Sequence, residues 1–315
     1  MKLAYLVMKK MLLKTPLNLF KNYIRQHKKL TRVYNYTYLI ILFIFSFFVN
    51  FYYANFGIEP MDTFVLYNGG FKVLNNLVPF KDYWLVTGPL MDYLNALIFK
   101  INGVSWRSYI IHSSFLNGIV SIILFHVLKE FNLKKIFCFF YSLMFSVLMY
   151  PSAGVPFVDH HATILVIISF CFFILGIKKR SNLYFFLVPL FLVLAFLCKQ
   201  TPTFYGIVLI FFLGLFYLIK NNNKKNFLFS IIAGSFFSLI FIFFFFFFTK
   251  IPISNFLEQY VLFARTVGTF RLSNWGFDII GIIHQYKFIF LPLIFIFYFL
   301  YNAYLNKNND NFLIL

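Results

Sequence analysis

Long apolar runs separated by short basic segments dominate this chain. A membrane-spanning helix needs about 20 mostly apolar residues, and eight stretches approach that length. Their unbroken apolar character favours helices over the alternating strands of a β-barrel. The pattern therefore predicts an all-α polytopic membrane protein with about eight transmembrane helices, at residues 36–54, 107–128, 136–150, 161–177, 182–198, 203–219, 227–248 and 284–304.

A long loop, expected over residues 55–106, separates the first two spans. Helix connections in compact bundles usually run about 2 to 8 residues, so a loop of this length is typical of a functional segment. Its first part repeats Phe64, Tyr67 and Phe71 at helical spacing, with Asp62 in the first turn. We expect an amphipathic helix there, lying on the membrane, whose dipole favours the carboxylate at its start.

A second short amphipathic helix is predicted after Gly88-Pro89. Its apolar residues, such as Leu94 and Leu97, recur on one face, whereas Asp92 and Asn95 fall on the other. We therefore expect Asp92 to face solvent. With about twelve residues the helix is too short to span a bilayer.

Composition and charge exclude several other classes of protein. The 315 residues are 61% hydrophobic and 12% charged, whereas soluble domains average about 25% charged residues. The net charge of +19 does not indicate a nucleic-acid partner, because the basic residues cluster between apolar runs instead of covering one solvated surface. The three cysteines lie inside apolar runs, so the sequence predicts no disulfide framework.

The distribution of charge predicts the orientation. Lys and Arg near span ends resist translocation, and they concentrate in alternate connections, while most acidic residues fall in the others. We expect residues 1–35 to form a cytoplasmic basic amphipathic segment on membrane lipids, 36–304 a transmembrane domain, and 305–315 a cytoplasmic tail. The predicted location is the inner (plasma) membrane, with both termini in the cytoplasm.

The order of motifs resembles the GT-C superfamily of glycosyltransferases. The Asp62-headed helix, the turn Pro79-Phe80-Lys81-Asp82, Gly88-Pro89-Leu90, and a second span beginning near Arg107 are similar to the branch with protein O-mannosyltransferases and lipid A aminoarabinose transferase. The likeness is strongest over residues 36–130. The sequence has Asp62-Thr63 where that family has Asp-Glu, and Thr87-Gly88-Pro89-Leu90 where it often has Lys-Pro-Pro-Leu.

The resemblance implies transfer of a sugar from a polyprenyl-phosphate donor to a lipid or glycan acceptor at the extracytoplasmic face. Asp62 is then the general base of a single inverting displacement; its alternative role is a helix N-cap. Asp82 would position the acceptor or the base, or is simply a solvated residue of a polar turn. The sequence indicates no definite cofactor, and a divalent metal is the one candidate.

A second acidic motif, Asp159-His160-His161, stands where a span begins. Charged residues beside hydrocarbon are costly, which favours a functional role for Asp159 and His160. The resemblance implies a second active-site acid in this loop, and Asp159 with His160 could hold a divalent metal together with Asp62. The alternative is an interfacial hydrogen-bonding cluster.

Cationic residues on the same face are candidates for binding the donor phosphate. Lys199-Gln200 ends the fifth predicted span, where an ammonium suits a phosphate as a point charge or simply reaches the headgroups. Arg265 and Arg271 lie in the last outer loop, and Arg forks match phosphate oxygens. The alternative for both arginines is contact with lipid headgroups.

Two other functions are compatible with the sequence. A transporter or flippase of lipid-linked intermediates would place ionisable groups near the bilayer midplane, often in repeated halves, and we find neither a repeat nor many charges there. A non-catalytic membrane subunit with a GT-C-like fold is the other alternative. The short chain favours it, whereas the acidic residues on one face favour an enzyme.

Overall fold

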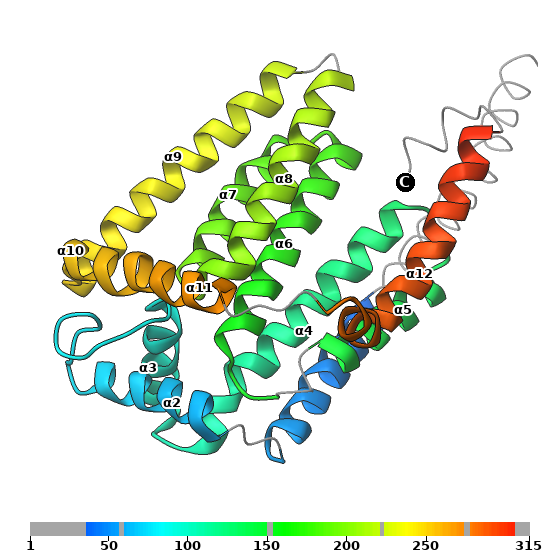
Figure 1. Cartoon of the computed structure of the whole chain (residues 1–315). Coiled ribbons are helices and arrows are strands. Elements are labelled where there is room, and N and C mark those ends of the chain that lie inside the picture. Colours follow the sequence, from blue (N-terminus) through cyan, green and yellow to red (C-terminus); the bar gives the residue numbers. More distant parts are fainter. Residues whose placement is uncertain (1–35, 57–59, 150–153, 221–223, 274–277, 306–315) are drawn as a thin grey trace, which may run out of the picture. The chain divides into compact units, whose positions relative to one another are not determined.

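The computed structural model describes residues 36–56, 60–149, 154–220, 224–273 and 278–305 of the chain. These residues form helices and connecting turns, with one isolated bridge between Pro79 and Tyr83. The helices are Tyr36–Ala54, α2 (Pro60–Leu74), α3 (Leu90–Asn102), α4 (Trp106–Glu130), α5 (Lys135–Met149), α6 (Val158–Lys179), α7 (Asn182–Phe196), α8 (Gln200–Lys220), α9 (Lys224–Thr249), α10 (Ile253–Phe256), the π-helix η1 (Leu257–Leu262), α11 (Phe263–Ser273) and α12 (Ile279–Leu305) (Figure 1).

Five helices are long and apolar enough to cross a membrane, and they confirm the all-helical membrane class. They are Tyr36–Ala54, α4, α6, α8 and the part of α9 from Lys225. The predicted third and fifth spans appear as α5 and α7, each of 15 residues, which is short of the roughly 20 that a perpendicular crossing needs. In α12, the pieces Ile279–Phe290 and Pro292–Tyr298 meet at 62°, because proline interrupts the helical hydrogen bonds. Counting that pair as one span gives six.

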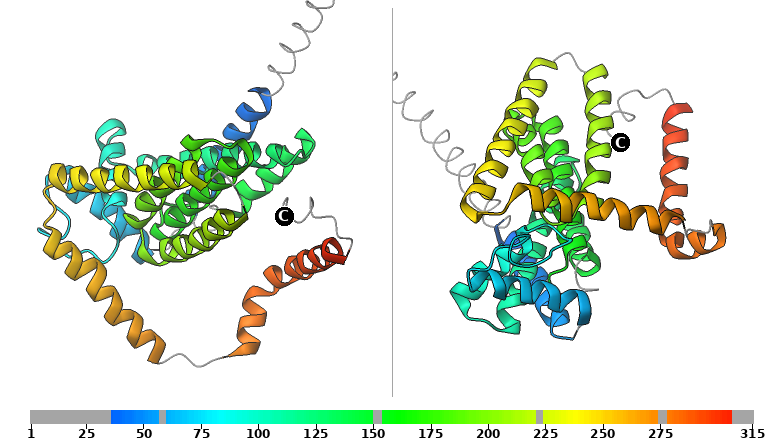
Figure 2. Two further views of the ribbon diagram at one scale, coloured as in Figure 1. Left: turned by 90° about the horizontal axis from the view of Figure 1, so that it is seen from above. Right: turned by 60° about the vertical axis from the view of Figure 1, so that its left-hand side comes forward.

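The chain divides into two compact units, one ending at Ile251 and the other beginning at Pro252. In the first unit, α6 packs against α4, α7 and α8, and α9 packs against α7 (Figures 1 and 2). In the second unit, α10, η1 and α11 follow one another as contacting helical segments. The predicted candidate residues fall in both units.

Amide and hydroxyl groups tie the helices of the first unit together. Asn50 donates to the Ser114 hydroxyl at 3.1 Å and to the Gly154 carbonyl at 3.0 Å. Asn117 donates to the carbonyls of Ser46 and Ser146, at 3.0 and 2.9 Å. Such contacts between small and polar residues are typical of membrane helix bundles, where lipid provides no hydrophobic force between helices.

One end of the first unit gathers the loops that the sequence placed outside. The Trp106 indole donates to the Ala54 carbonyl at 3.2 Å, and the Gly88 amide donates to the Cys198 carbonyl at 2.9 Å. A Cβ at position 88 would overlap the carbonyl of Leu197, so this close approach of α3 to the end of α7 requires glycine. The Tyr93 hydroxyl also reaches the Thr249 carbonyl, at 3.4 Å.

The opposite end of the first unit carries basic connections. Lys179 pairs with Glu130 at 3.2 Å, and the Lys178 ammonium lies 4.6 Å from the centre of the Phe131 ring. These contacts join the end of α4 to the end of α6. The two ends of the first unit therefore differ in their charged residues. One end has the basic connections, and the other has α2, α3 and the carboxyl groups of Asp82, Asp92 and Asp159.

Candidate functional site

The helices α2 and α3 form as the sequence predicts, but α3 packs with the opposite face inward. Asp92 and Asn95 are fully buried, whereas Leu97 and Ile101 are 53% and 67% exposed. The expectation that Asp92 faces solvent is therefore wrong. In a protein surrounded by lipid, apolar side chains can face outward without cost, and polar groups instead need partners inside the protein.

Two glycines of α2 create the space that Asp92 and Asn95 occupy. A Cβ on Gly69 would overlap the Asp92 carboxyl group, and one on Gly70 would overlap the Cβ of Asn95. The Asn95 amide donates to the Leu66 carbonyl at 3.1 Å. The two helices thus approach closely because α2 has glycines where α3 has the polar side chains of Asp92 and Asn95.

The Asp92 carboxyl is held by a tyrosine from the intervening turn. The Tyr83 hydroxyl donates to Asp92 Oδ2 at 2.7 Å, and the Lys72 ammonium lies 4.6 Å from the centre of the Tyr83 ring. Asp92 Oδ1 is buried and has no hydrogen-bond partner within the described part of the chain. We call Asp92, Tyr83, Lys72 and Gly69 the Asp92 cluster.

Burial dominates the electrostatics of this cluster. It raises the pKa of Asp92 to about 7, although the Tyr83 hydrogen bond and the Lys72 charge act in the opposite direction. Burial, and then the Asp92 charge, raise the pKa of Tyr83 above its ordinary value. The carboxyl therefore exchanges its proton near neutral pH. The sequence signal for this cluster is the pairing of Gly69-Gly70 with a polar stripe on the next helix.

Asp82 lies in the turn that carries Tyr83. Its exposed carboxylate accepts a hydrogen bond from the Val78 amide at 2.7 Å and so closes its own turn. Phe80, in the same turn, is buried with a positive φ of 66°. This geometry supports the turn-residue interpretation of Asp82, and the link from the turn to α3 is made by Tyr83.

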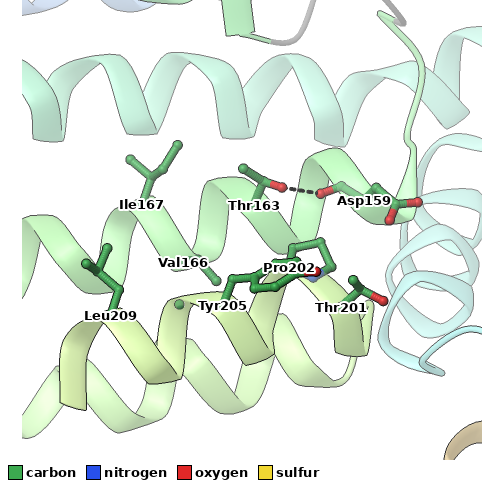
Figure 3. Close-up of a pocket in the computed structure, with 9 residues that line it drawn as sticks. Asp159, Thr163, Val166, Ile167, Thr201, Pro202, Tyr205 and Leu209 are labelled. Carbon is green, nitrogen blue, oxygen red and sulfur yellow. Dashed lines mark hydrogen bonds between the residues drawn. The ribbon is translucent and has the colours of Figure 1, made fainter. Parts of the chain in front are cut away.

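Asp159 lies at the start of α6, at one end of a groove between α6 and α8. The groove has a volume of about 430 Å³, within the range of about 300 to 1,000 Å³ common for small-molecule sites. Figure 3 shows Asp159 and Thr201 at one end, and Ile167 and Leu209 at the other. The groove is lined by Asp159, Thr163, Val166, Ile167, Thr201, Pro202, Tyr205, Gly206 and Leu209.

The histidines after Asp159 point to different surroundings. His160 is half-buried, with its ring 5.6 Å from that of Phe157. His161 is buried, and its ring lies 4.9 Å from the ring of His112 on α4. Consecutive positions at a helix start diverge in direction, as expected. The contact between His161 and His112 was not anticipated from the sequence.

Lys199 and Gln200 stand at the junction of α7 and α8. The Lys199 amide donates to the Ala195 carbonyl at 2.9 Å, and the Lys199 carbonyl accepts from the Thr203 hydroxyl at 2.8 Å. Both residues are half-buried. Neither is among the residues that line the groove, although Thr201 and Pro202, which follow directly, are.

Three predicted site residues receive less structural information. Asp62 lies in the first turn of α2, as predicted, but its side chain is outside the described residues. Arg265 is exposed on α11 in the second unit, and the side chain of Arg271 is also outside the described residues. Among the residues searched, no group of three or more His, Cys, Asp or Glu could hold a metal ion. The predicted metal site includes Asp62, so it lies partly outside the described residues and stays a prediction.

Comparison with known proteins adds no assignment. No protein-family description, curated protein or solved structure matches the chain significantly. Function must therefore be argued from the residues and their geometry.

Proposed function

We propose that the chain is a membrane glycosyltransferase that moves a sugar from a polyprenyl-phosphate donor to an acceptor at the extracytoplasmic face. The observation that carries this proposal is the groove between α6 and α8, with the Asp159 carboxylate at its polar end and apolar side chains along its length. An amphiphilic substrate fits such a groove. The start of α6, with Asp159, lies at the same end of the first unit as α2, because the Tyr109 hydroxyl reaches the carbonyls of both Thr63 and Pro156.

In the proposed reaction, the acceptor hydroxyl oxygen forms a bond to the anomeric carbon of the sugar. The bond from that carbon to the phosphate oxygen breaks, and its electron pair leaves with polyprenyl phosphate. The acceptor proton passes to the carboxylate of Asp62, the proposed general base. A single displacement of this kind inverts the anomeric configuration.

The other predicted residues have supporting roles in this proposal. Asp159 contacts the acceptor, and His160, the next residue in the chain, is a further candidate for binding the substrate. Asp82 keeps the turn between α2 and α3 in place. Lys199 and Gln200 are candidates for stabilising the departing phosphate, and Arg265 and Arg271, in the second unit, are separate candidates for the same role. A divalent metal remains an optional addition that the proposal does not need.

The proposal is tested with the full-length protein in liposomes and a panel of polyprenyl-phosphate sugars, with products followed by mass spectrometry. Asp62→Asn should lower the rate of transfer by about 10² to 10⁴, the usual contribution of a general base. Asp278→Asn, an exposed carboxylate in the second unit, is the matched control and should leave the rate unchanged. Undiminished transfer by Asp62→Asn excludes Asp62 as the base.

The proposed orientation has its own test. Single cysteines at positions 62, 134 and 224 are labelled from the cell exterior with a membrane-impermeant maleimide, in a background without the three native cysteines. The proposal requires labelling at position 62 and protection of the other two. Labelling at 134 or 224 without labelling at 62 reverses the orientation and removes the proposed enzyme.

A transporter or flippase of lipid-linked intermediates is the second candidate, because an apolar groove with a polar end also suits a lipid in transit. An enzyme releases free polyprenyl phosphate in the presence of both substrates, whereas a transporter moves the intact donor between leaflets. Donor flipping without release of polyprenyl phosphate contradicts the enzyme and favours the transporter. A non-catalytic subunit shows neither.

A further inference from the structure

The groove between α6 and α8 changes in character along its length. Asp159 and Thr201 lie at its polar end, and Ile167 and Leu209 lie eight residues further along their helices (Figure 3). Eight residues of helix rise about 12 Å, and one leaflet of a bilayer has about 15 Å of hydrocarbon, half of the total of about 30 Å. The groove therefore extends over most of one leaflet when the helices span the membrane.

The side of α8 that carries the groove is also accessible from outside the bundle. Tyr205 and Leu209 are both exposed, although Gly206 between them packs against Val166 of α6. A hydrocarbon chain can therefore enter the groove sideways from the lipid, without passing through the protein. The polar end then lies at the level of the headgroups.

The polar end selects the kind of headgroup. Within the described part of the chain, the Asp159 carboxylate has no ion pair, and the Thr163 hydroxyl is already engaged with the Asp159 carbonyl at 2.7 Å. Lys199 does not line the groove. A carboxylate without a cation repels a phosphate, whereas it accepts hydrogen bonds from a hydroxyl group.

We propose that this groove binds the acceptor of the sugar transfer, and that the acceptor is a lipid whose hydroxyl group hydrogen-bonds to Asp159. This inference rests on the proposed function and narrows it, because it selects a lipid acceptor over a soluble glycan. One hydrocarbon chain of the acceptor lies along Val166, Ile167 and Leu209. The phosphate of the donor binds at a cationic site outside this groove.

The inference is tested with two photoactivatable lipids that differ only in their headgroup. Diacylglycerol presents a hydroxyl and phosphatidic acid presents a phosphate; each carries a diazirine in one chain and is mixed into phosphatidylcholine vesicles with the full-length protein. Labelled peptides are located by mass spectrometry. Diacylglycerol should label residues 159–167 and 201–209 about tenfold more than phosphatidic acid, the effect of one charge-assisted hydrogen bond.

Three variants establish what produces the preference. Asp159→Asn should abolish the preference for diacylglycerol while keeping labelling by both lipids. Leu209→Trp fills the groove and should reduce labelling by both. Leu215→Trp, an exposed position of α8 outside the groove, is the matched control and should change nothing. Equal labelling by the two lipids in the unmodified protein, or a preference that survives Asp159→Asn, overturns the inference and leaves only ordinary boundary lipid.

Labelling requires no turnover, so its failure is distinguishable from failure of the proposed function. If the groove prefers diacylglycerol but the protein transfers no sugar, the result contradicts both the proposed enzyme activity and the proposed acceptor. Transfer to a soluble glycan that Leu209→Trp leaves unchanged keeps the enzyme and overturns the lipid acceptor. Transfer to diacylglycerol that Leu209→Trp reduces and Leu215→Trp preserves supports both.

Discussion

The two carboxyl groups of Asp92 and Asp159 lie at the same end of the first unit in opposite kinds of surroundings. Asp92 is fully buried between α2 and α3, next to glycine and held by a tyrosine hydroxyl. Asp159 is half-buried at the mouth of a groove and has no partner for its carboxylate in the described part of the chain. A carboxyl group whose partners are within the protein belongs to the fold, whereas one at the mouth of an open groove is available to a ligand.

Of the substitutions that test this comparison, one that fills the space beside Asp92 should cause the largest loss of stability. Gly69→Leu places a side chain where the Asp92 carboxyl lies, so we expect a loss of stability of about 3 kcal/mol, at the upper end for an overpacked core. Unfolding of the purified protein by a denaturing detergent measures it. Gly268→Ala, at a helical position with nothing within 4 Å, is the control and should not destabilise the protein.

Burial of Asp92 should make the stability of the protein depend on pH. The pKa of Asp92 is raised to about 7 in the folded protein, so its contribution to stability is fully present below its ordinary pKa of 3.8. That contribution is lost as pH rises from about 4 to 7, since the unfolded chain releases the proton first. Over this range, the midpoint of thermal unfolding of the unmodified protein should therefore fall relative to that of Asp92→Asn.

Asp92→Asn should remove this contribution to the pH profile, because asparagine resembles the protonated acid and carries no charge to bury. Tyr83 and Tyr93 lie beside the group, and burial raises the pKa of both, so neither ionises between pH 4 and 7. A profile that is equally steep after Asp92→Asn assigns the pH dependence to another group.

Removing the Tyr83 hydroxyl should have a smaller effect. Tyr83→Phe deletes the 2.7 Å hydrogen bond to Asp92, at a cost of about 1 to 3 kcal/mol for a buried acceptor left unpaired. The same bond lowers the pKa of Asp92, so its loss should move the pH-dependent transition to higher pH. Tyr141→Phe, an exposed tyrosine of α5, is the control and should change neither quantity.

Asp159→Asn should have the smallest effect on stability, within about 0.5 kcal/mol, as is usual for substitutions that remove no partner. Its effect should instead be on lipid selectivity and on sugar transfer. A loss of stability comparable to that of Gly69→Leu would show that Asp159 is part of the fold and would remove the contrast between the two carboxyl groups.

The two helices of the first loop show how much of the site the sequence could predict. Their existence and their starts near Asp62 and Pro89 follow from apolar spacing and turn residues. Which face packs inward did not follow, because the rule that polar residues face out assumes water as the surrounding solvent. For α3, the apolar face with Leu97 and Ile101 is exposed instead.

The groove between α6 and α8 could not be predicted from the sequence, for a different reason. Asp159 was identified from its place beside an apolar run, and Lys199 from its place at a span end. The relation of Asp159 to Thr201 and Leu209 depends on how α6 and α8 pack, which local spacing does not specify. The same holds for the contact between His112 and His161, which are far apart in the sequence.

The sequence by itself determined the helical membrane class, the positions of most helices and the separation of acidic from basic connections, because these follow from local hydrophobicity and charge. Only the tertiary structure decided that Asp92 is enclosed and that Asp159 opens onto a groove. The physical reason is that burial and pocket shape arise from contacts between helices distant in the chain, and Gly69 and Gly206 set how closely those helices approach.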